Sequence, residues 1–137
     1  MKGSYILLLY LPQNVEIKTK AKMFALERGY YAYVGSAMNS LEKRVKRHFK
    51  KEKKLHWHID YLTVRAKLLK AYLIPSNVKL EEELSMEMAK IGKVIEGFGA
   101  SDLKVPGNLF YFNHDPGYLI EELLRSLGLN YLTFPTY

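Results

Sequence analysis

The chain has 137 residues, 48% hydrophobic and 26% charged, which is ordinary for a globular protein with a single hydrophobic core. It has no cysteine, and this excludes disulfides, thiolate nucleophiles and thiolate metal sites. The formal net charge of +7 favours a polyanionic partner such as nucleic acid. The first apolar run, which ends before Pro12, is too short to cross a bilayer, so we expect a cytoplasmic protein with no membrane partner. The oligomeric state stays open.

The first part of the chain is predicted to be extended. Ser4–Leu11 is a nearly continuous apolar run, typical of a strand that is covered on both faces. Residues 15–21 alternate between apolar and charged side chains, and we expect this second strand to form a hairpin with the first. A turn at Gly29 predicts a third strand over 30–34, which ends at Gly35.

The rest of the chain mixes helical and extended segments. Residues 66–75 predict another strand, and the spacing of apolar residues predicts helices over 79–96 and 118–127. No repeat or linker divides the sequence. We therefore expect one α+β domain with a small, mainly antiparallel sheet of three to four strands flanked by helices, with a core at about 3–112 and a helical C-terminal extension over 113–137.

A basic helix is predicted after Asn39, its expected N-cap. With its apolar stripe centred on Val45, Arg44 and His48 lie beside the stripe and Arg47 points almost directly away from it. A guanidinium beside the core could present a fixed fork to a phosphate, or it could reach past the core edge into solvent. A basic stripe that could bind phosphates or be a solvated face consists of Lys43, Lys46, Arg47, Lys50 and Lys51.

The acidic run that begins at Glu81 places two carboxylates beside an apolar stripe. Glu81 and Glu87 flank this stripe, which is centred near Leu84, on opposite sides. Each carboxylate could be a metal ligand or an ion-pair partner, and helix geometry leaves both roles open for both residues.

Several short motifs occur together in a particular order. They are GSY at Gly3–Tyr5, YVG at Tyr33–Gly35, the helix with Arg44, HWHIDYL at 56–62 and GFGASD at 97–102. In this combination the chain resembles the GIY-YIG nuclease superfamily, and more closely its small stand-alone Uri-like branch, from Gly3 to about Phe112.

The resemblance implies a metal-dependent endonuclease that hydrolyses phosphodiesters of nucleic acid, with DNA expected rather than RNA. It implies that Tyr5 and Tyr33 lie together in the sheet, and that one of them, or a water that it orients, acts as general base. Arg44 would stabilise charge on the phosphoryl group, and His48, beside it on the helix, joins the predicted catalytic set. Glu81, with Glu87 as the alternative, would hold one Mg²⁺ or Mn²⁺ ion.

The same resemblance assigns structural roles, and the sequence also departs from the family pattern in three places. Gly35 is expected to allow a close turn into the helix, and Gly3 and Ser36 complete the structural motif. Ser36 stands where several relatives have lysine, and an insertion with the predicted second strand separates the two halves of the motif. The cysteines and Ser-His usual in the branch are replaced over 103–108. These changes motivate an alternative function, a nucleic-acid-binding module on the same fold with weak or lost catalysis.

The segment HWHIDYL allows a further alternative. As a strand it would place His56, His58 and Asp60 on one face, where they could bind Zn²⁺ and form a zinc hydrolase. As a helix it would disperse them. We favour a short helix, because the resemblance implies one before the next strand. His58 and Asp60 would then line the edge of the cleft, where they could orient the tyrosines or contact phosphate.

Overall fold

Eight strands and four helices follow one another in the computed structural model, which describes residues 1–99 and 104–135. In chain order they are β1 (Gly3–Leu11), β2 (Val15–Lys18), β3 (Met23–Leu26), β4 (Gly29–Ala37), α1 (Leu41–Phe49), α2 (His58–Thr63), β5 (Lys67–Pro75), α3 (Glu81–Met88), β6 (Lys93–Val94), β7 (Leu109–Phe112), α4 (Gly117–Ser126) and β8 (Leu132–Phe134). None of the helices in these two described ranges is long and apolar enough to cross a membrane.

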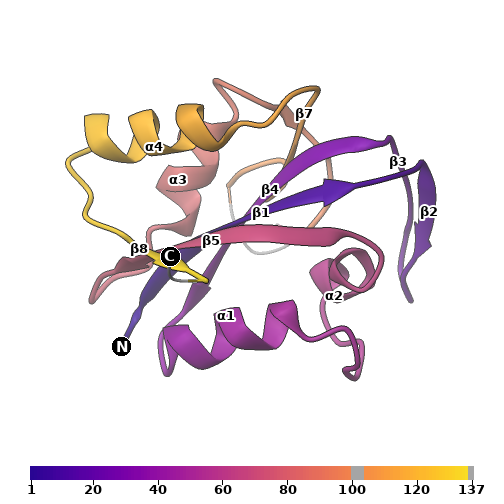
Figure 1. Ribbon diagram of the computed structural model, residues 1–137, viewed down its shortest axis with the longest axis horizontal. Helices are drawn as coiled ribbons and strands as arrows, with labels where there is room; N and C mark the ends of the chain where they lie inside the picture. Colours follow the sequence, from indigo (N-terminus) through magenta and orange to yellow (C-terminus); the bar gives the residue numbers. More distant parts are fainter. Residues whose placement is uncertain (100–103, 136–137) are drawn as a thin grey trace.

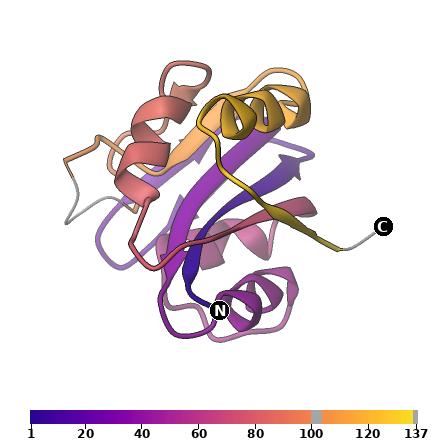
Figure 2. The same ribbon diagram turned by 90° about the vertical axis from the view of Figure 1, so that its left-hand side faces the viewer.

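Six of the strands form one sheet in the order β6-β7-β4-β1-β5-β8, and every neighbouring pair is antiparallel. The strands β2 and β3 form a separate two-stranded hairpin at one end of the molecule (Figure 1). Helices α1 and α2 cover one face of the sheet, and α3 and α4 cover the other, as the turned view also shows (Figure 2). The predicted α+β class with a mainly antiparallel, helix-flanked sheet is confirmed, but the sheet has six strands instead of the expected three to four, because the short β6 and β8 and the strand β7 join it.

The central strand β1 is buried on both faces, as its continuous apolar sequence predicted. Its odd-numbered residues from Tyr5 to Leu11 pack in the core under α1 and α2, with Leu41, Val45 and Leu62. Its even-numbered residues Ile6 and Leu8 pack in the core under α3 and α4. Side chains alternate across a strand, so one run of leucines contributes to two cores.

The predicted hairpin between the first two strands is wrong. The strand β1 pairs with β4 and β5, whereas β2 pairs with β3. Apolar on both faces, β1 is most stable at the centre of the sheet, while the alternating β2 needs cover on only one face. The third predicted strand is longer than expected, because β4 continues through Gly35 to Ala37.

Two helix boundaries also differ from the predictions. Helix α3 ends at Met88 instead of continuing to residue 96, because a turn at 89–92 brings β6 into the sheet beside β7. At Gly92 a side chain would meet the Phe112 ring, so the chain can cross close to β7 there. The N-cap of α1 is Ser40, whose hydroxyl accepts from the backbone N–H of Lys43 at 3.4 Å, and not Asn39.

The predicted C-terminal helix is confirmed within one residue at each end, as α4. The glycine after its C-cap residue, Gly128, has φ of +68°, the left-handed conformation that commonly ends a helix.

Candidate active site

Two tyrosines and a histidine from three different elements pack together under α1. Tyr5 lies on β1, Tyr33 on β4 and His48 on α1. The Tyr5 hydroxyl is 2.8 Å from His48 Nε2, and the ring centroid of Tyr33 lies 6.4 Å from that of Tyr5 and 6.3 Å from that of His48. Tyr5 is 2% exposed and His48 is fully buried, whereas Tyr33 is only partly buried. The structure therefore brings these three predicted catalytic residues into one cluster, with Tyr33 as its more accessible member.

Gly35 makes room for the Tyr5 phenol. It lies directly opposite Tyr5 in the β1–β4 register, and a Cβ on Gly35 would lie 2.5 Å from both Cζ and the hydroxyl oxygen of Tyr5. Gly35 is inside a continuous strand and does not have a positive φ. The expected close turn at this glycine is thus wrong, because what the position requires is the absence of a side chain.

A hydroxyl chain ties the candidate site to the start of α3. The hydroxyls of Ser36 and Ser4 are 2.8 Å apart, and the Ser4 oxygen accepts from the backbone N–H of Leu80 at 3.0 Å. Leu80 immediately precedes Glu81, the first residue of α3. Ser4 is fully buried, so this chain fixes the helix terminus against β1, next to Tyr5. The only sequence signal for Ser4 was its place inside the GSY motif.

Gly3, the other glycine of the predicted motif, allows close packing at the same end of β1. It is buried, and a Cβ there would meet the backbone of Ile74 and the side chain of Leu41. Gly3 therefore lets β5 and α1 approach β1 closely.

Arg44 is held in a fixed orientation beside this cluster. Its Nη1 donates to the backbone carbonyl of Ser36 at 3.2 Å, and its Cζ lies 4.4 Å from the centroid of the Trp57 ring. Its guanidinium also acts on the Tyr5 phenol, whose pKa it lowers against the larger effect of burial. Of the two orientations left open by the helix pattern, the structure has the one that faces the site.

Burial dominates the electrostatics of both phenols. It raises the pKa of Tyr5 and of Tyr33 well above the ordinary value, because a phenolate would lose its hydration. The charge of Glu81 raises both pKa values further, while Arg44 opposes the shift at both phenols. Both tyrosines are therefore protonated at neutral pH.

His48 is neutral for a related reason. Burial, together with the charge of Lys53, lowers the pKa of His48 to about 3. Its Nδ1 is buried and has no hydrogen-bond partner among the described residues. A neutral imidazole has one nitrogen with a proton and one with a lone pair, so His48 Nε2 either accepts the Tyr5 hydroxyl proton or donates to the Tyr5 oxygen.

The two candidate metal-binding carboxylates have different surroundings. The charge of Glu81 contributes to the pKa of Tyr5 and of Tyr33, so this carboxylate is within electrostatic range of both phenols. Glu87 instead forms an ion pair with Lys90 at 2.9 Å, within its own helix. Among the described residues, no three His, Cys, Asp or Glu side chains gather to form a metal site. A hard cation at Glu81 would therefore complete its shell mainly with water or substrate oxygens, as Mg²⁺ tolerates.

Arg47 has a partner that the sequence did not reveal. Its two terminal nitrogens donate to the two carboxylate oxygens of Asp60 at 2.8 and 3.0 Å, and its Cζ lies 4.8 Å from the Trp57 ring centroid. The Asp60 side chain is fully buried and also accepts from the backbone N–H groups of His56 and Trp57. Burial would raise the pKa of Asp60, but these hydrogen bonds lower it overall. The expectation that Arg47 points away from the fold is wrong, because this pair joins α1 to α2.

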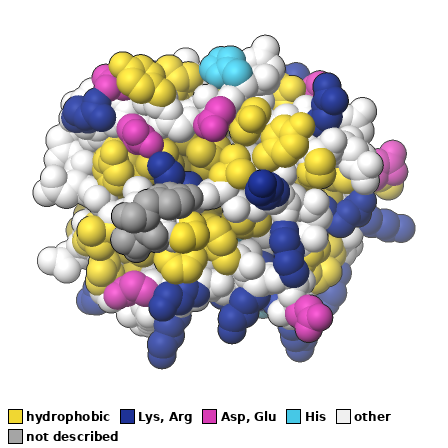
Figure 3. Space-filling model, viewed as in Figure 1, with side chains coloured by type: hydrophobic (Ala, Val, Ile, Leu, Met, Phe, Trp, Pro, Cys, Tyr) yellow, Lys and Arg dark blue, Asp and Glu magenta, His cyan; other side chains and the backbone are white. Residues whose placement is uncertain are grey.

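The other predicted nucleic-acid-binding lysines remain at the surface. Lys51 is exposed, but its ammonium donates to the backbone carbonyls of Thr63 and Ala66. Exposed side chains of α1 and the segment after it form what we call the basic face: Lys43, Lys46, Lys50 and Lys54. Figure 3 shows dark blue side chains gathered along the lower edge of the molecule, where α1 lies in Figure 1.

The histidine cluster is dispersed, as the helical interpretation predicted. Helix α2 begins at His58, Asp60 pairs with Arg47, and His58 Nδ1 accepts from the backbone N–H of Gly99 at 3.2 Å. This arrangement does not support a zinc site on His56, His58 and Asp60.

Asn108, in the 103–108 segment, lies next to the candidate site. It is buried, and its side-chain oxygen accepts from the Ser85 hydroxyl of α3 at 3.1 Å. A Cβ on Gly99 would contact both Asn108 and Tyr33, so the two side chains border the same space. A polar residue directly before the apolar strand β7 was the available signal. Leu103, and residues 100–102 of the GFGASD motif, lie outside the described residues.

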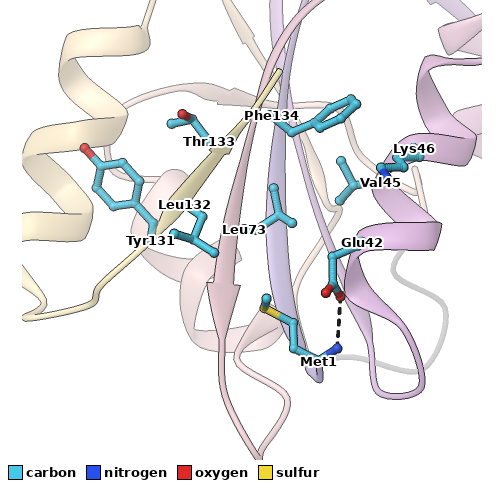
Figure 4. A pocket seen from close by; sticks show the side chains of 9 residues that line it. All are labelled: Met1, Glu42, Val45, Lys46, Leu73, Tyr131, Leu132, Thr133 and Phe134. Carbon is cyan, nitrogen blue, oxygen red and sulfur yellow. Dashed lines mark hydrogen bonds and ion pairs between the residues drawn. The ribbon is translucent and has the colours of Figure 1, made fainter. Parts of the chain in front are cut away.

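A different, mainly apolar hollow lies away from this cluster. Its volume is about 500 Å³. Figure 4 shows Leu73 of β5 and Phe134 of β8 facing Val45 of α1 across it, with the amino group of Met1 paired to Glu42 at 2.9 Å. None of the tyrosine, histidine or arginine side chains of the candidate site lines this hollow.

The chain is similar to a known protein family. No curated protein and no solved structure matched the chain. A family model matches residues 4–129, which include Tyr5, Tyr33, Arg44, His48 and Glu81. The chain therefore belongs to the family described as "Domain of unknown function DUF123".

Proposed function

We propose that this protein is a metal-dependent endonuclease of the GIY-YIG type, which hydrolyses phosphodiester bonds of nucleic acid, with DNA as the expected substrate. The observation that carries the proposal is the 2.8 Å contact between the Tyr5 hydroxyl and His48 Nε2, with Tyr33 beside it and Arg44 acting on the same phenol. These groups come from distant parts of the sequence. Packing of a hydrophobic core alone would not require an arginine, a histidine and two phenols to lie together.

Arg44 is suited to neutralise a phosphate. The rate-limiting difficulty in phosphodiester hydrolysis is the negative charge that repels the nucleophile and grows in the transition state. Ser36 and Trp57 hold the guanidinium in place before any substrate arrives, so little reorganisation is needed. A divalent cation held by Glu81, Mg²⁺ or Mn²⁺, would add positive charge on the same phosphate.

The phenols and His48 would position the attacking water. Since burial keeps Tyr5 and Tyr33 protonated, neither acts as a resting phenolate, and Tyr33, the more accessible phenol, would orient the water by a hydrogen bond. His48, neutral because its pKa is lowered to about 3, would hold the Tyr5 phenol in place through their hydrogen bond.

The second candidate function is a nucleic-acid-binding module with weak or lost catalysis. The observation that favours it is burial: Tyr5 is 2% exposed and His48 is fully buried, so neither reaches a substrate directly. The basic face would bind phosphates whether or not the site is active.

A cleavage assay separates the two functions. Labelled single-stranded, flapped and branched DNA, and matched RNA, are incubated with protein and Mg²⁺ or Mn²⁺, while fluorescence anisotropy in EDTA measures binding. We expect cleavage that Arg44→Ala and Glu81→Ala abolish with binding retained, and that Glu87→Ala leaves unchanged. Binding without cleavage of any substrate would favour the module, and cleavage that survives Arg44→Ala would overturn the proposed site.

A further inference from the structure

A hollow of about 520 Å³ adjoins the candidate active site. Tyr33 lines this hollow and is also a member of the candidate site, so the two are adjacent. The hollow, which we call the Trp57 hollow, is also lined by Lys22, His56, Trp57, His58 and Gly99. Its size is that of a site for one small ligand.

The walls of the Trp57 hollow are largely aromatic and are held in place. The rings of His56 and Trp57 lie 5.0 Å apart and edge to face. The His58 ring is fixed between Phe24 and Phe98, at centroid distances of 5.5 and 5.6 Å. Planar ring systems such as nucleobases stack on surfaces of this kind.

The polar groups of the hollow suit a nucleotide. His58 Nδ1 accepts a backbone hydrogen bond, so its other nitrogen, Nε2, carries the proton and is a donor. Burial and the charge of Lys22 lower the pKa of His58, which therefore stays neutral at neutral pH. A neutral N–H donor pairs well with the carbonyl oxygens and ring nitrogens of a base.

The charge around the hollow matches a polyanion. Lys22 contributes an ammonium, and the Arg44 guanidinium lies 4.4 Å from the Trp57 ring centroid, while that of Arg47, at 4.8 Å, is already paired with Asp60. None of the described residues that line the hollow is acidic. A base attached to phosphates would gain a charge attraction from Lys22 and Arg44 that an uncharged aromatic ligand lacks.

Lys22 comes from the β2–β3 hairpin, the insertion between the two halves of the tyrosine motif. It lies in the turn between the two strands, and a Cβ on Gly97 would lie 2.6 Å from its Nζ. The hairpin thus reaches across to the loop after β6 and forms one side of the hollow. This placement gives the insertion a role next to the candidate site.

We propose that the Trp57 hollow binds one unpaired nucleobase of a single-stranded nucleic acid, next to the phosphate that Arg44 would hold. The inference rests on the proposed nuclease function and names its substrate class. Bases inside a continuous duplex are paired and stacked on their neighbours, so their faces are not free to contact these rings, and a duplex would bind only where a base is unpaired or extruded. Flaps, single-stranded ends and mismatched positions would be preferred over continuous duplex.

Tryptophan fluorescence tests this proposal without any cleavage. Trp57 is the one tryptophan of the chain, so its emission reports on the hollow. Wild-type protein in EDTA is titrated with short oligothymidylate, with the same strand made of abasic residues, with a continuous duplex and with thymidine monophosphate. We expect quenching by oligothymidylate and roughly 5- to 100-fold weaker binding of the abasic strand, the range that loss of one base stack produces. The duplex and the mononucleotide should also bind more weakly.

A matched pair of variants locates the binding. Lys22 and Lys20 are exposed lysines in the same turn, and only Lys22 lines the hollow. We expect Lys22→Ala to weaken binding of oligothymidylate several-fold and Lys20→Ala to leave it unchanged. Equal quenching by abasic and thymidine strands, equal effects of the two lysine variants, or mononucleotide binding as tight as the strand would each overturn the proposal.

The outcome is distinguishable from failure of the nuclease proposal. If the protein binds oligothymidylate as expected but cleaves no substrate, the base-binding proposal stands and the nuclease proposal fails. If it cleaves DNA but binds abasic and thymidine strands equally, the nuclease proposal stands and the base-binding proposal fails.

Discussion

Gly35 and Tyr5 face each other across the β1–β4 pair, and the position of the Tyr5 ring depends on the missing side chain of Gly35. The phenol can lie over the strand toward His48 because the residue opposite has no side chain. The glycine of the YVG motif therefore leaves the space that the Tyr5 ring occupies, so a change at either residue affects the other. In a strand interior a glycine costs stability, which the packing of the Tyr5 ring offsets here.

Gly35→Ala should destabilise the fold by about 1–3 kcal/mol, because the new methyl group overlaps the Tyr5 ring in a packed core. Urea unfolding measures the free energy. In a Tyr5→Leu background the same substitution should cost less, since the overlapping atoms are gone. An equal cost in both backgrounds would show that the ring is not what Gly35 accommodates.

The stability of the fold should depend on the protonation of His48. Its pKa is about 3 in the folded state and about 6.5 when unfolded, so the unfolded chain binds more protons between these values. The contribution is fully present above about pH 6.5 and falls as pH decreases, by roughly 1 kcal/mol between pH 7.5 and 5.5. Urea unfolding of wild type and His48→Gln across this range should give a steeper decline for wild type. Parallel curves would contradict the buried neutral state of His48.

At the scale of elements, long segments with a local pattern were predictable. The strands β1 and β5 and the helices α1 and α4 follow from apolar runs or helical periodicity, whereas α2 was favoured over a strand only through the family resemblance. The short strands β6 and β8 have two and three residues, and pairing with distant strands defines them. A single sequence has no signal for such pairing, and for the same reason α3 was predicted too long.

For the candidate site, motif positions selected Tyr5, Tyr33, Arg44 and Glu81. In the structure the charges of Arg44 and Glu81 both act on the pKa of the two phenols. The stacking of Trp57 on Arg44 could not be predicted, because it depends on the path of the irregular segment between α1 and α2.

The pair between Arg47 and Asp60 makes α1 and α2 one structural unit. Arg47→Ala should destabilise the protein by about 2–4 kcal/mol, because it leaves the buried Asp60 carboxylate without its cation. Arg47→Lys should recover only part of the lost unfolding free energy, since an ammonium cannot make the two parallel hydrogen bonds to the Asp60 carboxylate. Lys46→Ala, at an exposed position one residue earlier, is the control and should change the unfolding free energy by less than about 0.5 kcal/mol. Comparable losses for Arg47→Ala and Lys46→Ala would mean that the buried pair contributes nothing special.

At the scale of the whole molecule, the charges are divided between the two layers of helices. The basic face lies on the side of α1, whereas α3 and α4 on the other side carry glutamates in their sequences. A nucleic-acid strand would therefore be attracted to the α1 side of the molecule. This is the side of the sheet on which Tyr5 and Tyr33 lie.

Salt dependence of DNA binding tests this asymmetry. Each phosphate contact contributes roughly −0.9 for duplex, or −0.7 for a single strand, to the slope of log K against log salt concentration. Lys43→Glu on α1 should weaken binding and make the slope shallower, while Arg125→Glu on α4, with the same change of charge, should have a much smaller effect. Equal effects would mean that only net charge matters.

We propose that two phenols, one guanidinium and one carboxylate form a single site for a phosphate. A crystal of the protein with Mn²⁺ and a short uncleavable phosphorothioate strand would test this arrangement, since Mn²⁺ is located by anomalous scattering. We expect one Mn²⁺ at Glu81 and a backbone phosphate between this ion and Arg44, beside Tyr5 and Tyr33. A strand that contacts only the exposed lysines of α1, with no ion at Glu81, would contradict it.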